Sequence, residues 1–471
     1  MNEGQAREAV RALLVEHAAQ RRRYDVIDRA VRPWSDAEAA RRMGVQQGKN
    51  FHRHLKIAKM AQTPFLGLVL DTYGQSLKVD NFFSSGAKQA PAWRWWQTNR
   101  MNARQTGLHR AALEYGTAYA SVLPAAGGAA RIGVHSPRRL VAFYGEPFAW
   151  PGEGDASSEE FPIIALAIQG RHLRLYDETN VYYFGAEHVP GDPLAWSASH
   201  YLTDANLPYL EARPHGVGVT PIVRYQDRMM ADGEETNGIV EHLIALSDRI
   251  DRTNYEQGVA QYWSAFKQRY VLGWMPKNEQ DAMRQSASDT WFFGNKDVKV
   301  GQFDSTDLSQ YTEARQATVR DLAATAQVPA QSLGANAISN ISADGLAALE
   351  TSKDRKASEI QTSLGESHEQ LLRLCAHITG DGDGAADFGA EVKWAETSSR
   401  SFAQTVDGLG KLAALLGVPK EELWADIPGW TKERVERAKA AIPPLGGAGL
   451  FDPDEEEPSA AVGPADVATA E

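Results

Sequence analysis

The chain has 471 residues, 43% of them hydrophobic and 23% charged, which is ordinary for a globular protein of two or more domains. No uninterrupted apolar run approaches the roughly 20 residues that a membrane-spanning helix needs. Cys375 is the only cysteine, which excludes an internal disulfide and a cysteine-based zinc cluster and fits synthesis in a reducing cytoplasm.

The net charge of −12 is unevenly spread along the chain. The segment after Lys439 holds seven acidic residues and neither lysine nor arginine, so the rest of the chain carries only −5. Such a mildly acidic body lacks the basic footprint of a conventional DNA-binding surface. We expect residues 443–471 to form an acidic disordered tail.

Helical patterns dominate the first 115 residues. Residues 3–23 place Ala6, Val10, Leu13 and Leu14 on one face of an amphipathic helix, and we expect a loop over 24–34. Further helices are expected after Ser35, which begins a capping box, and over 50–59, 64–73 and 99–115.

An aromatic cluster lies before the last of these helices. Its members are Phe82, Phe83, Trp93, Trp95 and Trp96. Such a cluster either stacks on nucleic-acid bases or a docking partner, or fills the core between a loop and the next helix. The core interpretation is favoured.

Residues 117–225 contain mainly short strands separated by glycine, proline, aspartate or asparagine. The expected strands span 117–123, 131–135, 139–144, 163–168, 173–176, 181–184 and 221–225. Together with the helices before them, they predict one α+β region over residues 1–232.

Three long helices are expected after residue 232. The first, over 234–263, carries a seam of Ile239, Leu243, Leu246 and Ile250 that then turns polar and small. The second spans 305–327, and the third, from 343 to 379, has a stripe that is apolar at its ends and basic in its middle. An interrupted stripe suits a helix that faces ring neighbours along part of its length, but periodicity leaves an ordinary bundle equally open.

Two segments separate these helices. Residues 265–304 form a small module with strands at 269–273, 290–293 and 298–303, too short for an independent core. Residues 328–341 (VPAQSLGANAISNI) are polar, small and broken by glycine and proline, a composition typical of a mobile loop. A strand at 391–394 and helices at 399–416, 420–423 and 431–441 complete the expected elements.

The sequence offers no catalytic, metal-binding or cofactor-binding constellation. The stretch GVQQGK at 44–49 lacks the spacing of a phosphate-binding loop, and the acidic turn DGDGAAD at 381–387 lacks the closing glutamate of a calcium loop. No Gly-x-Ser-x-Gly or His-Glu-x-x-His motif is present. We therefore expect a protein that is not an enzyme and uses no cofactor and no metal.

Three stretches of the chain resemble the portal proteins of tailed bacteriophages, closest to the SPP1-type portal family, over roughly residues 20–440. The first is AKMAQTPFLGLVLDTYGQSL followed by WWQTNRMNARQTGLHRAALEYGTAYASV, and the second is GVGVTPIVRYQDR leading into GIVEHLIALSDRIDRTNYEQ. The third is VPAQSLGANAISNISADGLAALETSKDRKASEIQ with VKWAETSSRSFAQTVDGLGKLAALLGVPKEELW. Within it, SADGLA at 342–347 is a looser match to the family's Ser-Gly-x-Ala pattern.

The resemblance implies a mainly helical α+β fold, the portal fold, with wing, stem, clip and C-terminal crown-like regions. The implied regions are a wing at 1–232, a first stem helix at 233–264, a clip at 265–304, a second stem helix at 305–327, a tunnel loop at 328–342, a long helix returning to the wing at 343–397 and crown-like helices at 398–442.

The resemblance also implies a structural role. Portal proteins assemble as a ring, expected here to be dodecameric, at one capsid vertex of the virion, where the ring is the channel for DNA packaging and ejection. The expected partners are further copies of the chain, double-stranded DNA, the terminase large subunit, a head–tail adaptor, and the major capsid protein or scaffold. Assembly is expected in the host cytoplasm, without a membrane.

Candidate DNA-facing residues follow from the same resemblance. The tunnel loop would present Gln331, Ser332, Asn336, Ser339 and Asn340 to the channel. Lys353, Arg355 and Lys356 either meet phosphates or pair with Glu350, Asp354 and Glu359 on neighbouring turns, and the second interpretation is slightly favoured. Few free cations suit a channel through which DNA slides, because each phosphate contact adds a salt-dependent attraction that acts as a brake.

Two other classes of function remain open. The first is another capsid-associated structural protein, such as a minor head or scaffold protein, although a scaffold would be mostly coiled coil and would not carry the module at 265–304. The second is a nuclease or hydrolase, which would need a cluster of acids or a nucleophile motif that the sequence lacks.

Overall fold

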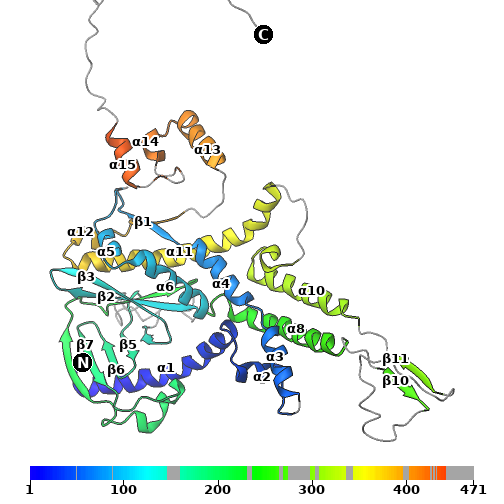
Figure 1. Cartoon of the computed structure of the whole chain (residues 1–471). Coiled ribbons are helices and arrows are strands. Elements are labelled where there is room, and N and C mark those ends of the chain that lie inside the picture. The colour runs from blue at the N-terminus through cyan, green and yellow to red at the C-terminus, as the bar shows by residue number, and fades with distance from the viewer. Residues whose placement is uncertain are drawn as a thin grey trace, which may run out of the picture. The chain divides into compact units, whose positions relative to one another are not determined.

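The computed structural model describes residues 1–48, 50–86, 88–145, 160–230, 236–264, 269–273, 298–302, 307–335, 343–395, 402–424, 427, 430 and 432–441. The chain divides into two compact units, Met1–Glu396 and Thr397–Glu471. The first unit mixes helices and sheets (Figure 1), so the predicted mainly helical α+β class is confirmed.

Helices make up most of the first unit. The α-helices are α1 (Glu3–Val31), α2 (Asp36–Met43), α3 (Phe51–Ala61), α4 (Phe65–Ser76), α5 (Trp93–Thr98), α6 (Met101–Tyr115), α8 (Ile244–Ser264), α10 (Ser309–Ala326), α11 (Ala343–Ile378) and α12 (Gly382–Ala385). The 3-10 turns are η1 (Pro193–Ser197), η2 (Ser199–Tyr201), η3 (Glu241–Leu243) and η4 (Ala330–Leu333).

The strands of the first unit form four antiparallel sheets among the described residues. The strands are β1 (Val79–Phe83), β2 (Thr117–Ala125), β3 (Ala129–His135), β4 (Leu140–Phe143), β5 (Ile164–Gln169), β6 (His172–Tyr176), β7 (Asn180–Gly185), β8 (Tyr209–Pro214), β9 (Ile222–Gln226), β10 (Arg269–Leu272), β11 (Lys299–Gln302) and β12 (Glu391–Trp394). Their orders are β4-β5-β6-β7-β8, β3-β2-β9, β1-β12 and β10-β11.

The two larger sheets and their helices form layers. Val10 and Leu14 of α1 pack with Leu173 and Phe184 on one face of the five-stranded sheet. The other face packs against the three-stranded sheet, whose side chains alternate along β2: Tyr119 points to the five-stranded sheet, whereas its neighbours Ala118 and Ala120 belong to the core shared with α6 and α11. The two sheets and the helices that cover them therefore form one continuous packed body.

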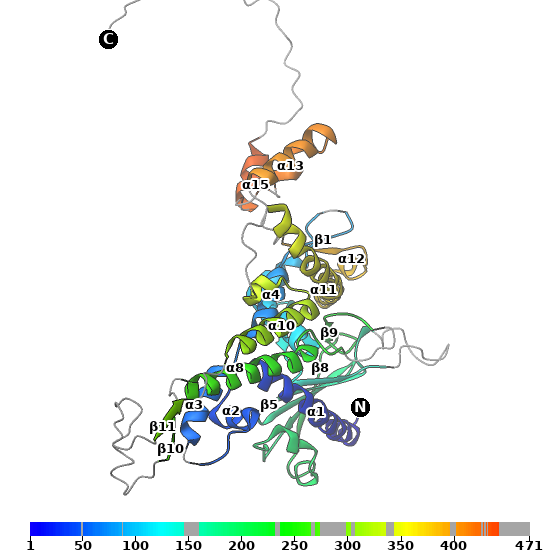
Figure 2. The same ribbon diagram turned by 90° about the vertical axis from the view of Figure 1, so that its right-hand side faces the viewer.

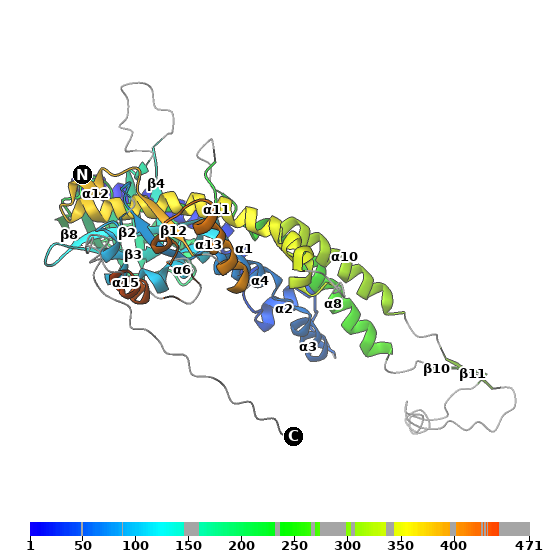
Figure 3. The same cartoon turned by 90° about the horizontal axis from the view of Figure 1, so that it is seen from above.

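The helices α8 and α10 pack side by side. Asn254 of α8 accepts a hydrogen bond from Arg315 of α10, and Gln257 donates to Thr312. Helices α2 and α3 lie on the side of α8 away from α10 in all three views (Figures 1, 2 and 3). One side of the α8–α10 pair is therefore covered by α2 and α3, and its other side is formed by α10.

The aromatic cluster is part of the core, as favoured from the sequence. Trp93 and Trp96 stack with ring centroids 5.2 Å apart, and both are buried, as is Phe82. Phe82 and Phe83 belong to β1, a strand that was not predicted from the sequence. This strand pairs with β12, about 300 residues away along the chain, so no local sequence pattern predicts it.

Helix α1 is longer than predicted. It continues to Val31 instead of ending at Arg23, and most of the expected loop over 24–34 is helical. Tyr24 and Ile27 continue the buried stripe, and no helix-breaking residue occurs before Pro33. The buried stripe therefore extends the helix past its predicted end.

Helix α8 begins later than predicted, at Ile244. The chain before it crosses the end of α6: Thr236 donates its hydroxyl to the Gly116 carbonyl, and the Ile239 amide donates to the Leu113 carbonyl. Gly116 has φ 85°, and a Cβ there would lie 1.9 Å from the Thr236 carbonyl oxygen, so only glycine fits this crossing.

The second unit is helical where it is described. Its helices are α13 (Phe402–Leu415), α14 (Lys420–Leu423) and α15 (Lys432–Ala440). They match the expected helices at 399–416, 420–423 and 431–441. The predicted tail at 443–471 and the predicted strand at 290–293 lie outside the described residues.

Candidate functional site

The junction between α10 and η4 begins the predicted tunnel loop. Helix α10 ends at Gln327, which adopts a left-handed conformation (φ 56°), and the Val328 amide bonds back to the Ala323 carbonyl at 3.0 Å. The buried hydroxyl of Tyr73 in α4 donates to the Ala326 carbonyl at 2.8 Å. These bonds satisfy carbonyls that a helix C-terminus otherwise leaves unpaired.

The first half of the predicted loop is packed, not mobile as its composition suggested. Pro329 leads into η4, and the turn closes with a bond from the Ala335 amide to the Ala330 carbonyl. Val328, Leu333 and Ala335 are buried in the main core of the first unit. The expected mobility was wrong for these residues because three apolar side chains of this mostly polar stretch pack into the core.

The predicted loop residues fall into two groups. Ser332 is exposed, whereas Gln331 is half-buried and its side-chain oxygen has no hydrogen-bond partner among the described residues. Asn336, Ser339 and Asn340 lie outside the described residues.

The basic residues of α11 mostly pair with acids of the same helix. Lys353 lies 3.9 Å from Glu350 and 3.5 Å from Asp354, and Lys356 lies 3.7 Å from Glu359. These are the ion pairs that the sequence analysis slightly favoured over phosphate contacts. Arg355 is exposed and forms no ion pair within the described part of the chain.

The C-terminal part of α11 is fixed to the edge of the three-stranded sheet. Ser363 and Ser367 donate hydrogen bonds, each 2.9 Å long, to the backbone carbonyls of Gln226 and Arg224 in β9. Four residues of helix rise about 6 Å, close to the roughly 6.6 Å spanned by two residues of a strand. The two serines therefore match the spacing of carbonyls along an otherwise unpaired strand edge.

A buried pair of histidines strengthens the same contact. The nitrogens Nε2 of His109 (α6) and His368 (α11) are 2.7 Å apart, His109 Nδ1 is 3.0 Å from the Leu77 carbonyl oxygen, and His368 Nδ1 is 3.0 Å from the Tyr225 hydroxyl. Burial lowers the pKa of His109 to about 4 and that of His368 well below its ordinary value. Both rings are therefore neutral at pH 7, which allows one continuous chain of hydrogen bonds.

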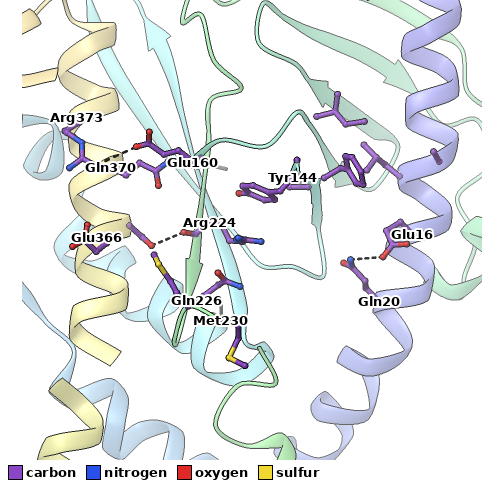
Figure 4. A pocket seen from close by; sticks show the side chains of 18 residues that line it. Glu16, Gln20, Tyr144, Glu160, Arg224, Gln226, Met230, Glu366, Gln370 and Arg373 are labelled. Atoms are coloured by element: carbon purple, nitrogen blue, oxygen red, sulfur yellow. Dashed lines mark hydrogen bonds and ion pairs between the residues drawn. The ribbon is translucent and has the colours of Figure 1, made fainter. Parts of the chain in front are cut away.

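A groove of about 960 Å³ opens between α1 and α11 (Figure 4). Arg224 stacks on Tyr144 with its guanidinium carbon 4.1 Å from the ring centroid, and Arg373 lies 3.7 Å from Glu160. Ser367 also lines the groove, but its hydroxyl donates to a backbone carbonyl and faces no general base. The geometry shows no nucleophile poised for catalysis among the described lining residues.

The described residues contain neither a candidate metal site nor a membrane-spanning helix. No group of three or more His, Cys, Asp or Glu residues there is placed to hold a metal ion. In the acidic turn, Asp381 accepts from the Gly384 amide and Asp387 from the Ser85 amide, so both serve the local fold. None of the described helices is long and apolar enough to cross a membrane.

Residues 69–442 match the family described as phage portal protein, SPP1 Gp6-like. The chain belongs to this family. The portal protein of Mycobacterium phage D29 is 23% identical over 379 residues, which cover 75% of this chain and 73% of the relative. That of Mycobacterium phage L5 is 23% identical over 400 residues, which cover 80% and 78%.

Solved structures of gene transfer agent (GTA) particles are also similar. A chain from the neck of an empty GTA particle has a TM-score of 0.42 at 11% identity and covers 88% of this chain and 95% of its own length. A chain from the virion of a native GTA particle has a TM-score of 0.40 at 13% identity with the same coverage. The family match and the two portal relatives, and not these structural likenesses, show that this chain is a portal component of a phage-type particle.

Several residues that organise this portal protein were missed in the sequence. Tyr73 closes the end of α10, and Ser363, Ser367 and His368 join α11 to β9. The available signal was two serines four residues apart, followed by a histidine, on the otherwise apolar face of a long helix. Such a set on a buried face needs partners, which only the neighbouring strand edge supplies.

Proposed function

We propose that the chain assembles as a ring, dodecameric in the particle, at one capsid vertex, and that double-stranded DNA passes through the ring during packaging and ejection. Membership of the portal family is the observation that carries this proposal. The proposal includes the regions that the family resemblance implies. They are a wing at 1–232, stem helices at 233–264 and 305–327, a clip at 265–304, a tunnel loop at 328–342, a returning helix at 343–397 and crown-like helices at 398–442.

The way in which α10 and α11 are anchored supports a channel role for the segment between them. Helix α10 is capped by Tyr73 and continues into the packed turn η4, and α11 is fixed to β9 by Ser363 and Ser367. A loop is most useful for contact with a moving substrate when both of its supports are rigid. Residues 336–342 connect two such supports, which favours them over Gln331 as the DNA-contacting part.

The charges near this segment suit DNA that slides. Lys353 and Lys356 pair with acids of α11, so little free positive charge is available to hold phosphates. Fewer phosphate contacts mean a shallower dependence of DNA affinity on salt concentration and less resistance to movement. Arg355, exposed and without an ion pair in the described residues, is the leading phosphate contact of this helix.

The same proposal names the partners. The ring would receive the terminase large subunit during packaging and a head–tail adaptor afterwards, and the major capsid protein or scaffold would surround it in the virion, with assembly in the host cytoplasm. It would act without enzymatic activity, cofactor or metal of its own.

Negative-stain microscopy of the purified full-length protein tests the ring directly. We expect rings with a central hole, and sedimentation should give a matching single large species. Monodisperse monomers at micromolar concentration would contradict the proposal.

A second experiment tests the DNA-contacting loop. Because Leu333 and Ala335 are buried, a deletion that began at residue 329 would damage the core. Replacing residues 336–341 with a Gly/Ser sequence of equal length avoids this damage. We expect normal rings and a loss of DNA packaging in an assembly assay, whereas loss of the rings would show that the segment serves assembly instead.

A further inference from the structure

A recess on the first unit gathers arginines from three helices. It lies where α1, α2 and α8 meet and has a volume of about 390 Å³. We call it the arginine recess, and it is lined by Val26, Arg29, Arg41, Arg42, Met43, Ile244, Asp248 and Arg252. No residue of it belongs to the predicted tunnel loop.

The positive charge of the arginine recess is only partly compensated. Arg42 pairs with Glu38 and Asp248, and Arg41 pairs with Glu38. Among the described residues, Arg29 and Arg252 in contrast donate only to backbone carbonyls, those of Asp25 and Arg42. Four guanidinium groups thus face two carboxylates, which leaves a net charge of about +2 for a partner to neutralise.

The environment of the arginine recess strengthens its attraction for an anion. Met43 is buried, and Ile244 and the 45%-exposed Val26 add apolar surface beside the arginines. Desolvation raises the pKa of Asp248 even though Arg42 acts in the opposite direction. Arg29, Arg41 and Arg252 are exposed, so an arriving carboxylate can reach their guanidinium groups, and burial of these charges in a contact would strengthen the attraction.

The opposite side of the helix pair carries exposed carboxylates. Thr312 and Arg315 of α10 face α8, so residues about half a turn away on the helix point outward. Glu313 and Asp321 lie there, exposed and without an ion pair among the described residues. The exposed, small side chains of Ala317 and Ala324 lie on the same side of α10, and Arg320 is the one nearby cation on this part of the helix.

A closed ring of identical copies makes a heterologous contact, in which one side of each copy meets the other side of the next. The arginine recess lies on the α2 side of α8, and α10 lies on the other (Figure 3). The two sides therefore carry opposite unpaired charges and would be brought together by ring closure.

We propose that the arginine recess receives the carboxylates of Glu313 and Asp321 from α10 of a second copy of the chain. The proposal rests on the ring of the proposed function and names the contact that closes it. The small side chains of Ala317 and Ala324 let α10 approach closely. Arg29 and Arg252 supply guanidinium groups that pair with no carboxylate among the described residues.

Paired charge reversals test this contact in the full-length protein. The recess variant carries Arg29→Glu and Arg252→Glu, and the α10 variant carries Glu313→Arg and Asp321→Arg. Each variant alone places like charges against each other, so we expect the fraction of protein in rings, measured by sedimentation velocity and negative-stain microscopy, to fall at least tenfold. An equimolar mixture restores opposite charges at every junction, and we expect rings to return.

Matched controls separate the contact from folding. Arg171→Glu changes an exposed arginine in the β5–β6 turn and should leave the rings intact. The change Arg252→Gln removes the charge without introducing the opposite one, so it should weaken the rings less than charge reversal does. Circular dichroism should show the wild-type helical signal in every variant.

The outcomes distinguish the two proposals. If the wild-type chain forms no rings, the proposed function itself fails. If wild-type rings form and the variants form them equally well, or the mixture recovers nothing, the recess contact is wrong and the ring remains. If the recess variant keeps its rings but loses affinity for a DNA duplex, the recess binds nucleic acid instead and this proposal is overturned.

Discussion

The two ends of α11 are held in different ways. From Ile360 onward one face of the helix is buried in the main core or bonded to β9, and Leu364 and Leu371 on that face are fully inaccessible to solvent. From Glu350 to Glu359 its polar side chains mostly meet one another in ion pairs at the helix surface. One continuous helix therefore has an end that is fixed to β9 and an end that leads to the predicted tunnel loop.

This difference separates stability from function along one element. Buried apolar contacts and buried hydrogen bonds contribute several kcal/mol to folding, whereas an exposed ion pair contributes roughly 0–1 kcal/mol. The anchored end can therefore keep the other end in place while the charges there remain free to change. The apolar stripe in the sequence is interrupted where the helix changes from buried contacts to surface ion pairs.

The largest effect is expected from a cavity in the anchored end. Leu364→Ala removes buried methyl groups from a position with no solvent exposure, which should lower the free energy of unfolding by about 2–5 kcal/mol. Urea denaturation followed by tryptophan fluorescence measures the loss. The control Ser352→Ala, at an exposed position near the other end, should change it by less than about 0.5 kcal/mol. Equal effects would show that both ends are held alike.

The next effect comes from the bonds to the sheet edge. Ser363→Ala and Ser367→Ala each leave a carbonyl of β9 without its partner, at a cost of about 1–2 kcal/mol per site. Denaturation of the single and double variants checks this expectation, with Ser358→Ala, at an exposed site of the same helix, as control. A double variant as stable as the wild type would mean that apolar packing alone holds α11 to β9.

The sequence predicted the anchored helix well and its attachments poorly. The helix expected at 343–379 is α11, and the strand expected at 391–394 is β12, because helical and strand periodicity are local properties of the chain. The strand β1 escaped notice because its partner is distant in sequence, and β8 because Tyr209–Pro214 is mostly exposed and lacks alternation.

The same limit applies to the candidate site. The ion pairs of Lys353 and Lys356 were foreseeable, since partners three residues apart face each other on any helix. The packing of residues 328–335 was not, because it depends on the main core and on Tyr73 of α4, far away in the chain. The composition of a segment indicates how it behaves in isolation, but it does not show which distant residues will pack against it.

A pH-dependent loss of stability should also map to the anchored end. His109 and His368 face each other, a backbone carbonyl and a tyrosine hydroxyl, with no charged side chain in direct contact. The pKa of His109 is about 4 in the folded chain and 6.5 when unfolded, so between these values the unfolded state binds more protons. Stability is therefore greatest above pH 6.5 and falls as the pH drops towards 4.

The measurement is urea denaturation at pH 7.5 and pH 5.5. His109 alone should lower the free energy of unfolding by roughly 1 kcal/mol at pH 5.5. Buried His17 and half-buried His135, whose pKa values are also lowered to about 4, should add to the loss. The double change His109→Gln and His368→Gln should make the pH dependence shallower, and an unchanged slope would assign it to the other histidines.

The smallest effect on stability is expected at the other end of α11, where it sharpens the question of DNA contact. Lys353→Ala and Lys356→Ala remove only surface ion pairs of 3.5–3.9 Å, so each should change the free energy of unfolding by less than about 0.5 kcal/mol. Their effect on DNA depends on whether these pairs persist in the channel. If they do, both variants should keep the wild-type salt dependence of DNA binding to the assembled ring, while Arg355→Ala should make it shallower, because only Arg355 would then release a counterion from the DNA. If the two lysine variants reduce the salt dependence as much as Arg355→Ala does, the lysines exchange their acidic partners for phosphates, and the pairs seen in the isolated chain are a resting arrangement.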